Sequence, residues 1–140
     1  MKIMVSACLL GENCKYNGGN NRNEKVLEYV RGHQVISVCP EVMGGLPTPR
    51  VPSEIRDNVV INKEGTIVDK EFRKGAKEAF EIALRENVDL VILKAKSPSC
   101  GTKQVYDGTF SGRLVDGQGI FTAMIKEAGI SFIDEKEFIE

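Results

Sequence analysis

Two apolar patterns alternate along the chain. Short continuous runs predict strands, and apolar residues three and four positions apart predict helices. Short runs rich in β-branched residues, bounded by glycine, proline or polar turn residues, are typical of buried strands. Four such runs occur, at residues 2–7, 33–40, 88–95 and 130–134. The run at 88–95 contains an unbroken apolar stretch, as expected of a central parallel strand that is covered on both faces.

Three segments between these runs carry apolar residues three and four positions apart, which is the spacing of an amphipathic helix. They span residues 21–31, 70–87 and 118–128. Asn21 or Asn23 is suited to cap the first of these helices, and Gly32 is suited to end it.

Three further segments lack this periodicity. Residues 40–55, "PEVMGGLPTPRVPSEI", hold four of the five prolines and two adjacent glycines, a composition that predicts an irregular loop. Residues 58–69, "NVVINKEGTIVD", predict a β-hairpin that turns at "NKEG", with Gly65 in the left-handed conformation. Residues 96–119 predict a polar, glycine-rich loop.

The order of these elements is strand, helix, strand, hairpin, helix, strand, helix, strand. It predicts an α/β fold of one doubly wound, three-layer domain over residues 1–140, with a mainly parallel sheet and an inserted β-hairpin. A chain of 140 residues can bury a core without disulfides or metals.

Composition and charge argue against several classes of protein. Hydrophobic residues make up 41%, charged residues 28%, and the formal net charge is −1, which disfavours a large nucleic acid as partner. The apolar runs are far shorter than the roughly 20 residues that span a bilayer, and the N-terminus is too short and polar for a signal peptide. We therefore expect a cytoplasmic protein without a membrane partner. The sequence carries no signal for an oligomeric state.

Three of the four cysteines follow predicted strands. Cys8 follows the first, Cys39 lies at the end of the second, and Cys100 comes shortly after the third. Ligands bind at the carboxyl ends of strands in open parallel sheets, so these cysteines should meet at one edge. Structural disulfides are rare in a reducing compartment, which favours a metal or cluster, a catalytic thiol or inert buried side chains for the four cysteines.

Cysteine spacing separates these possibilities only in part. Zinc sites usually pair cysteines two to four residues apart, and a thioredoxin-like site needs Cys-x-x-Cys; neither pattern occurs. A papain-like thiol needs a histidine, and the only one, His33, begins the strand that Cys39 ends. A 4Fe-4S cluster with three thiolate ligands and one open iron is an attractive alternative. The simplest alternative is that the cysteines are buried core residues without a chemical role.

Three motifs, in order, carry a resemblance to a known family. "SACLLGENCKYNGG", "VCPEVMGGLPTPRVPSEI" and "KAKSPSCG" together resemble the thiouracil desulfidase (TudS) family over about residues 2–133. The resemblance implies a 4Fe-4S cluster held by Cys8, Cys39 and Cys100, with one iron left open. It also implies removal of sulfur from a thiolated uracil, giving uracil and sulfide without net redox change.

The resemblance also implies roles for other residues in these motifs. Glu41 would be the acid/base group, and Ser97 or Ser99 would be a catalytic partner, with Ser97 preferred. Cys14 belongs to the first motif, and three roles stay open for it: approaching the cluster, replacing an assumed ligand, or packing the loop.

The residue types suit this chemistry. A soft thiocarbonyl sulfur would bind the open iron, which polarises the carbon that water attacks. Glu41 could take the proton of that water, and a serine of "SPSC" could donate to the pyrimidine ring, although "SPS" is also an ordinary turn sequence. Arg50 is the one charge in "PTPRVP". It could hold that loop, contact the substrate, or pair with Glu54 or another carboxylate.

We therefore expect an enzyme that hydrolytically desulfurises a small thiolated pyrimidine of the 2- or 4-thiouracil type. Whether the substrate is a free base, a nucleoside or a modified RNA stays open. One alternative is an iron-sulfur or metal-binding protein for electron transfer or cluster delivery, which a fourth thiolate from Cys14 would favour. Another is a nucleotide-binding module whose cysteines are incidental and bind no metal.

Overall fold

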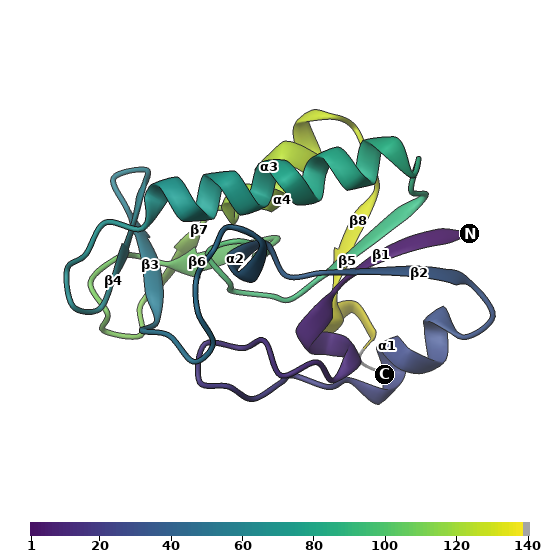
Figure 1. The fold of residues 1–140 in the computed structure, drawn as a ribbon, viewed down its shortest axis with the longest axis horizontal. Helices are drawn as coiled ribbons and strands as arrows, with labels where there is room; N and C mark the ends of the chain where they lie inside the picture. The colour runs from purple at the N-terminus through teal and green to yellow at the C-terminus, as the bar shows by residue number, and fades with distance from the viewer. Residues whose placement is uncertain (139–140) are drawn as a thin grey trace.

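A four-stranded parallel sheet forms the centre of the computed structural model, which describes residues 1–138 (Figure 1). The strand order is β2-β1-β5-β8. The bounds are β1 Lys2–Ser6, β2 Gln34–Val38, β5 Leu90–Leu93 and β8 Phe132–Asp134. The four strands predicted from apolar runs are thus confirmed, and they pair in parallel with one another.

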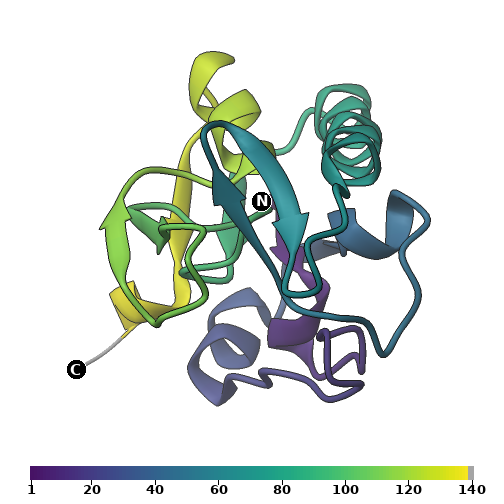
Figure 2. The ribbon, with the colours of Figure 1, turned by 90° about the vertical axis from the view of Figure 1, so that its left-hand side faces the viewer.

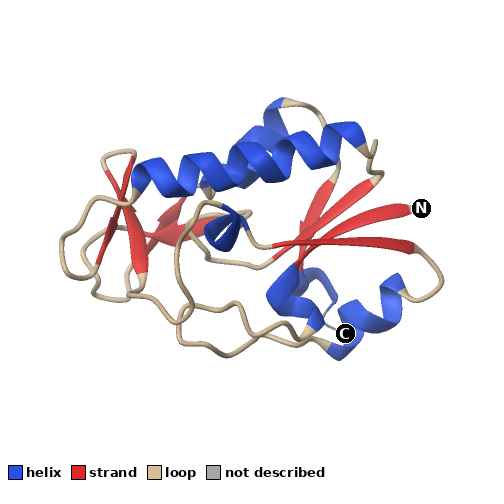
Figure 3. Ribbon diagram, viewed as in Figure 1, coloured by secondary structure: helices blue, strands red, loops and turns tan. Residues whose placement is uncertain are grey.

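Helices cover both faces of the sheet (Figures 1 and 3). One face carries α1 (Glu24–Val30) with the 3-10 turns η1 (Ala7–Leu10) and η2 (Glu135–Phe138), and the other carries α3 (Asp69–Arg85) and α4 (Ile120–Glu127). The predicted three-layer α/β architecture is therefore confirmed.

Alternation along β1 explains the two layers of core. Ile3 and Val5 belong to the hydrophobic cluster shared with α1, whereas Met4 belongs to the cluster shared with α3 and α4. Successive side chains of a strand point to opposite faces, so a wholly apolar strand needs a helical cover on each. Of the two asparagines considered as a cap, Asn23 caps α1, because its side chain accepts hydrogen bonds from the N–H groups of Lys25 and Val26.

The hairpin prediction is wrong in its pairing. Residues 40–55 are not one irregular loop, since they contain the short helix α2 (Pro40–Met43) and strand β3 (Ser53–Arg56). The hairpin joins β3 to β4 (Val59–Asn62) through Asp57 and Asn58, both with positive φ. Asp and Asn tolerate this left-handed backbone, which two-residue hairpin turns require. The "NKEG" turn also forms, but it closes only a single bridge.

The segment 96–119 is not entirely loop either. It contains a second antiparallel hairpin, β6 (Gln104–Tyr106) with β7 (Leu114–Asp116). Both hairpins lie beyond the carboxyl ends of the parallel strands, and Figure 2 views the molecule from that side. Within residues 1–138, no helix has both the length and the apolar character needed to cross a membrane.

Candidate active site

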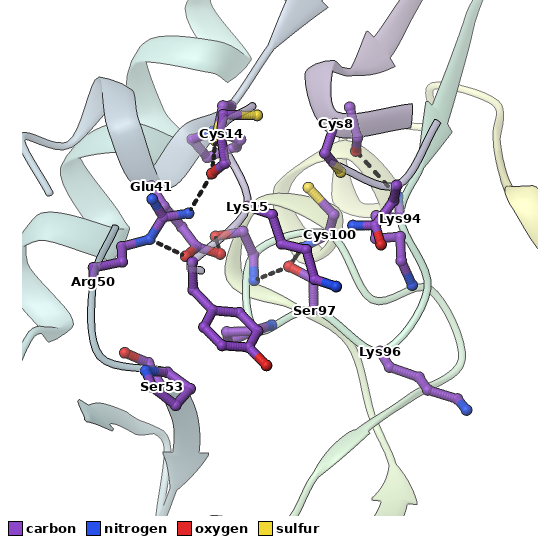
Figure 4. A pocket seen from close by; sticks show the side chains of 18 of the residues that line it. Cys8, Cys14, Lys15, Glu41, Arg50, Ser53, Lys94, Lys96, Ser97 and Cys100 are labelled. Atoms are coloured by element: carbon purple, nitrogen blue, oxygen red, sulfur yellow. Dashed lines mark hydrogen bonds and ion pairs between the residues drawn. The ribbon is translucent and has the colours of Figure 1, made fainter. Parts of the chain in front are cut away.

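A cavity of about 540 Å³ is lined by residues that follow the carboxyl ends of the parallel strands and by residues of the two hairpins. It brings together every residue that the sequence singled out for chemistry. These are Cys8, Cys14, Cys39, Glu41, Arg50, Ser97, Ser99 and Cys100. Figure 4 shows the thiols of Cys8, Cys14 and Cys100 at one end of this cavity, with Glu41 and Arg50 on one side and Lys94 on the other.

The parallel strands explain why the cysteines converge. Cys8 lies in η1 immediately after β1, and Cys39 follows β2 and caps the start of α2. Cys100 comes a few residues after β5, in a turn closed by the bond from the N–H of Gly101 to the carbonyl of Ser97. The three adjacent strands all run in one direction, so their following loops share an edge.

Two glycines allow α2 to lie directly against α3. A Cβ atom added to Gly75 would stand 1.6 Å from the carbonyl oxygen of Pro40, and one added to Gly44 would stand 1.9 Å from that of Glu71. Only glycine permits so close an approach of two backbones. This contact sets the position of α2 and, with it, of Cys39 and Glu41.

The thiols have different electrostatic surroundings. Burial raises the pKa of Cys8 and of Cys100, while hydrogen bonds from Asn21 and Ser6, respectively, act against the rise. For Cys39, the hydrogen bond from the Cys14 thiol lowers the pKa, and the N–H of Val42 adds to this against the effect of burial. Cys39 is thus the thiol of this group best suited to be a thiolate.

Glu41 is held in one orientation. Its Oε1 accepts a hydrogen bond from Arg50 Nε at 3.0 Å, and its Oε2 accepts one from Ser99 Oγ at 3.3 Å. The Arg50 side chain is 7% exposed and that of Glu41 is 16% exposed. Of the partners considered for Arg50, the structure shows Glu41 and not Glu54, whose carboxylate accepts from backbone N–H groups of the second hairpin.

Arg50 also fastens the loop that carries Cys14. Its Nη2 donates to the carbonyl oxygen of Cys14 at 2.8 Å, and its backbone N–H donates to the carbonyl of Tyr16 at 2.7 Å. The Cys14 carbonyl oxygen also accepts a hydrogen bond from the Cys39 thiol, at 3.8 Å between oxygen and sulfur. One guanidinium therefore links the acid of α2 to the loop after η1.

The two serines have different environments. The Ser97 Oγ accepts hydrogen bonds from the N–H groups of Ser99 and Cys100, at 3.0 and 3.1 Å, and so shapes the turn before Cys100. Among the described residues, its own hydroxyl proton has no acceptor. Ser99 is 1% exposed and donates to Glu41.

Several residues that line the cavity were not predicted from the sequence. Tyr106 and Phe110 of the second hairpin line the cavity, as does Lys94. Lys94 Nζ lies 3.0 Å from Glu135 Oε2, and Glu135 Oε1 accepts the N–H of Ala95 at 2.7 Å. Lys94 stands inside "KAKSPSCG", which was the available signal, but its partner Glu135 is distant in sequence.

The donor set fits an iron-sulfur cluster. Soft thiolates are the ligands that such clusters take, and the cysteines line one end of a single cavity beside the backbone of glycine- and proline-containing loops. Within residues 1–138, no three His, Cys, Asp or Glu side chains are grouped to hold a single metal ion. Thiolates of a four-iron cluster bind different iron atoms, so they need a wider spacing.

The fold and this cavity define an α/β protein with its ligand site at the carboxyl ends of parallel strands. The chain belongs to the 2-thiouracil desulfurase family, whose model matches residues 3–137, and this confirms the resemblance.

Two similar proteins extend this comparison. The uncharacterized protein YbbK of Bacillus subtilis (strain 168) is 37% identical over 145 residues, covering 96% of each chain. A solved structure of the 4Fe-4S-dependent thiouracil desulfidase TudS is 38% identical, with a TM-score of 0.91 over 97% of this chain and 91% of that one.

Proposed function

We propose that this chain is an iron-sulfur enzyme that hydrolytically desulfurises a small thiolated pyrimidine of the 2- or 4-thiouracil type, releasing sulfide. The observation that carries the proposal is the placement of Glu41, an oriented carboxylate, in the same cavity as thiols from three strand ends. Membership of the family and the likeness to a desulfidase named as 4Fe-4S-dependent support it.

We assign the cluster ligands to Cys8, Cys39 and Cys100. When bound, a cluster with three thiolate ligands supplies one open iron as a Lewis acid for the soft substrate sulfur. Cys14 is assigned a supporting place, because its carbonyl oxygen accepts hydrogen bonds from the Cys39 thiol and from Arg50 Nη2. In this assignment Cys14 positions Cys39 and is not itself a ligand.

Glu41 is the proposed acid/base group, which accepts a proton from the attacking water. Oε1 is paired with the charged guanidinium of Arg50, whereas the partner of Oε2 is the neutral Ser99 hydroxyl at 3.3 Å, so Oε2 is the atom that takes the proton of the attacking water. The water oxygen bonds to the ring carbon, the carbon-sulfur bond breaks, and Glu41 returns its proton to the departing sulfur, giving HS⁻. The second water proton leaves the added hydroxyl as the ring carbonyl forms, and it joins HS⁻ to give hydrogen sulfide. Water is consumed and hydrogen sulfide is released, so no electron donor or acceptor is needed.

Ser97 is the preferred hydrogen-bond donor to the substrate. Its Oγ is fixed by two backbone N–H groups, while its hydroxyl proton is available toward the cavity. A donor held in place in this way can stabilise charge that develops on the ring as water adds.

Anaerobic reconstitution tests the proposal. We expect about four irons per chain, the content of one cluster, and equal amounts of sulfide and uracil from 2- or 4-thiouracil. Iron binding should be lost in Cys8→Ser, Cys39→Ser and Cys100→Ser but kept in Cys14→Ser. A full iron content without sulfide release would instead support a binding or delivery protein, and absence of iron after reconstitution would overturn both.

A further inference from the structure

The turn of the second hairpin contributes an aromatic side chain to the cavity. Phe110 lies between β6 and β7 and lines the cavity together with Tyr106 of β6. Phe110 belongs to neither of the hydrophobic core clusters formed by the described residues. Packing of the core therefore does not account for its placement, and its half-buried side chain forms part of the cavity wall.

The backbone at Phe110 adopts a costly conformation. Its φ is +59°, in the left-handed region that a bulky side chain rarely occupies. Such conformations persist only where surrounding contacts impose them, and they are concentrated at ligand sites. The contacts that impose this one come from the other hairpin.

Strand β3 clamps the turn through two side chains of opposite charge. Glu54 Oε1 accepts the N–H groups of Gly108 and Phe110, at 2.9 and 3.1 Å. Arg56 Nε donates to the carbonyl oxygen of Gly108 at 2.9 Å. A Cβ on Gly108 would lie 2.6 Å from the Cβ of Arg56, so the turn and β3 are in direct contact. The two hairpins thus fix Phe110 at the cavity.

We propose that Phe110 is a specificity-determining residue that stacks on the flat ring of the bound heterocycle. This inference rests on the proposed function, since it concerns the substrate of the same cavity. An aromatic face contacts a planar base through its π-system, and it makes a poorer contact with a ring that has been puckered by saturation. Phe110 would therefore select a planar pyrimidine against its 5,6-dihydro form.

The test measures ring binding separately from turnover. Calorimetric titration of the reconstituted protein with uracil and with 5,6-dihydrouracil gives both dissociation constants without any reaction. We expect Phe110→Ala to weaken uracil binding about ten-fold, within the range of base-aromatic stacking. Binding of 5,6-dihydrouracil should change little, and Phe110→Tyr should keep wild-type values.

A matched control lies in the same hairpin. Val115 of β7 is 40% exposed and does not line the cavity, so Val115→Ala should leave both constants unchanged. Iron content and melting temperature are compared across all variants, so that a folding defect is recognised. If Phe110→Ala folds poorly, Phe110→Leu takes its place, because it keeps the apolar volume but removes the aromatic face, and the same loss of uracil binding is expected.

The outcomes separate this inference from the proposed function. An unchanged uracil constant in Phe110→Ala, an equal loss for both ligands, or no uracil binding by the wild type overturns the stacking role. If the wild type releases sulfide from thiouracil while Phe110→Ala binds uracil normally, only the stacking role fails. If uracil binding depends on Phe110 but no thiouracil is converted, the stacking role holds and the proposed reaction fails.

Discussion

The guanidinium of Arg50 joins two parts of the site that are 36 positions apart in sequence, the Cys14 carbonyl and the loop of Arg50 itself. The sequence marked Arg50 as the single charge in a proline-rich stretch. It left several carboxylates as possible partners, because the choice between them depends on how α2 and β3 lie in space. Only the fold shows that Arg50 forms its ion pair with Glu41 and not with Glu54.

Removal of this guanidinium should destabilise the protein and the site together. Arg50→Ala leaves Glu41 without its charged partner and the Cys14 carbonyl without a donor. Breaking a fully buried pair costs 3–5 kcal/mol, and for this slightly exposed one we expect about 2 kcal/mol.

Urea denaturation of the cluster-free chain measures the loss of stability. Arg50→Lys should fall between wild type and Arg50→Ala, because one ammonium cannot reach both acceptors. Arg85, which is 69% exposed, supplies the control, and Arg85→Ala should change stability by less than about 0.5 kcal/mol. Equal stability of Arg50→Ala and wild type would show that the contact is energetically neutral.

The roles of Ser97 and Ser99 can be distinguished by the kcat values of their alanine variants. Ser97→Ala removes the proposed donor to the ring, so we expect kcat to fall about 100-fold. Ser99→Ala removes one long hydrogen bond to Glu41, which should cost about ten-fold in kcat, equivalent to one hydrogen bond.

Both rates are divided by iron content, because Ser97 also holds the N–H of Cys100 and its loss can lower cluster occupancy. A larger loss per cluster in Ser99→Ala than in Ser97→Ala would reverse the assignment of the two serines.

At the level of elements, the parallel strands could be predicted from continuous apolar runs, and the helices from apolar residues three and four positions apart. The hairpins could not, for two physical reasons. Two turn signals compete in residues 53–69, and the strand pairing follows the Asp57–Asn58 turn, not "NKEG". Strands β6 and β7 have three residues each and lie among glycine and polar residues, so no apolar run marks them as one marks the equally short β8. The site's cysteines were predictable from the parallel strands, whereas its hairpin wall was not.

Close packing of α2 on α3 gives a prediction for Gly75. In an exposed helix interior, Gly→Ala gains about 1 kcal/mol of stability. Here the added Cβ would stand 1.6 Å from the carbonyl oxygen of Pro40, so α2 must move and carry Cys39 and Glu41 with it. We expect Gly75→Ala to destabilise the protein by about 2 kcal/mol and to bind less iron on reconstitution.

Thermal unfolding and iron analysis check this prediction. Lys77, exposed on the same helix, is the control, and Lys77→Ala should leave both measurements close to wild type. A Gly75→Ala protein of raised stability and full iron content would mean that α2 moves away without consequence.

At the scale of the whole molecule, charge is distributed unevenly. The chain has a formal net charge of −1, yet five basic and two acidic residues line the cavity: Lys15, Arg50, Lys63, Lys94, Lys96, Glu41 and Glu54. A total taken from the sequence cannot show this, because the basic residues come from separate segments that the fold brings together. This excess of basic residues suits a group bound by three thiolates, because the basic side chains offset the negative charge of the thiolates.

The three assigned ligands follow three adjacent strands, so a bound cluster would tie segments from across the chain to one another. A group that binds only the folded state stabilises it by about 2.7 kcal/mol at a hundred-fold excess over its dissociation constant. For a chain of this length that raises the melting temperature by about 8 °C. We therefore expect anaerobic reconstitution to raise the melting temperature by this order, and iron removal by a chelator to reverse it.

The stabilisation by the cluster should come from the segments that hold it. Hydrogen exchange should slow most at residues 7–10, 39–43 and 97–101, the segments that carry the three proposed ligands, because their opening would require loss of the cluster. Cys8→Ser should show neither the rise nor the added protection, whereas Cys14→Ser should show both. A rise in Cys8→Ser equal to that of wild type would place the cluster elsewhere, and loss of the rise in Cys14→Ser would make Cys14 a ligand in place of a residue that supports Cys39.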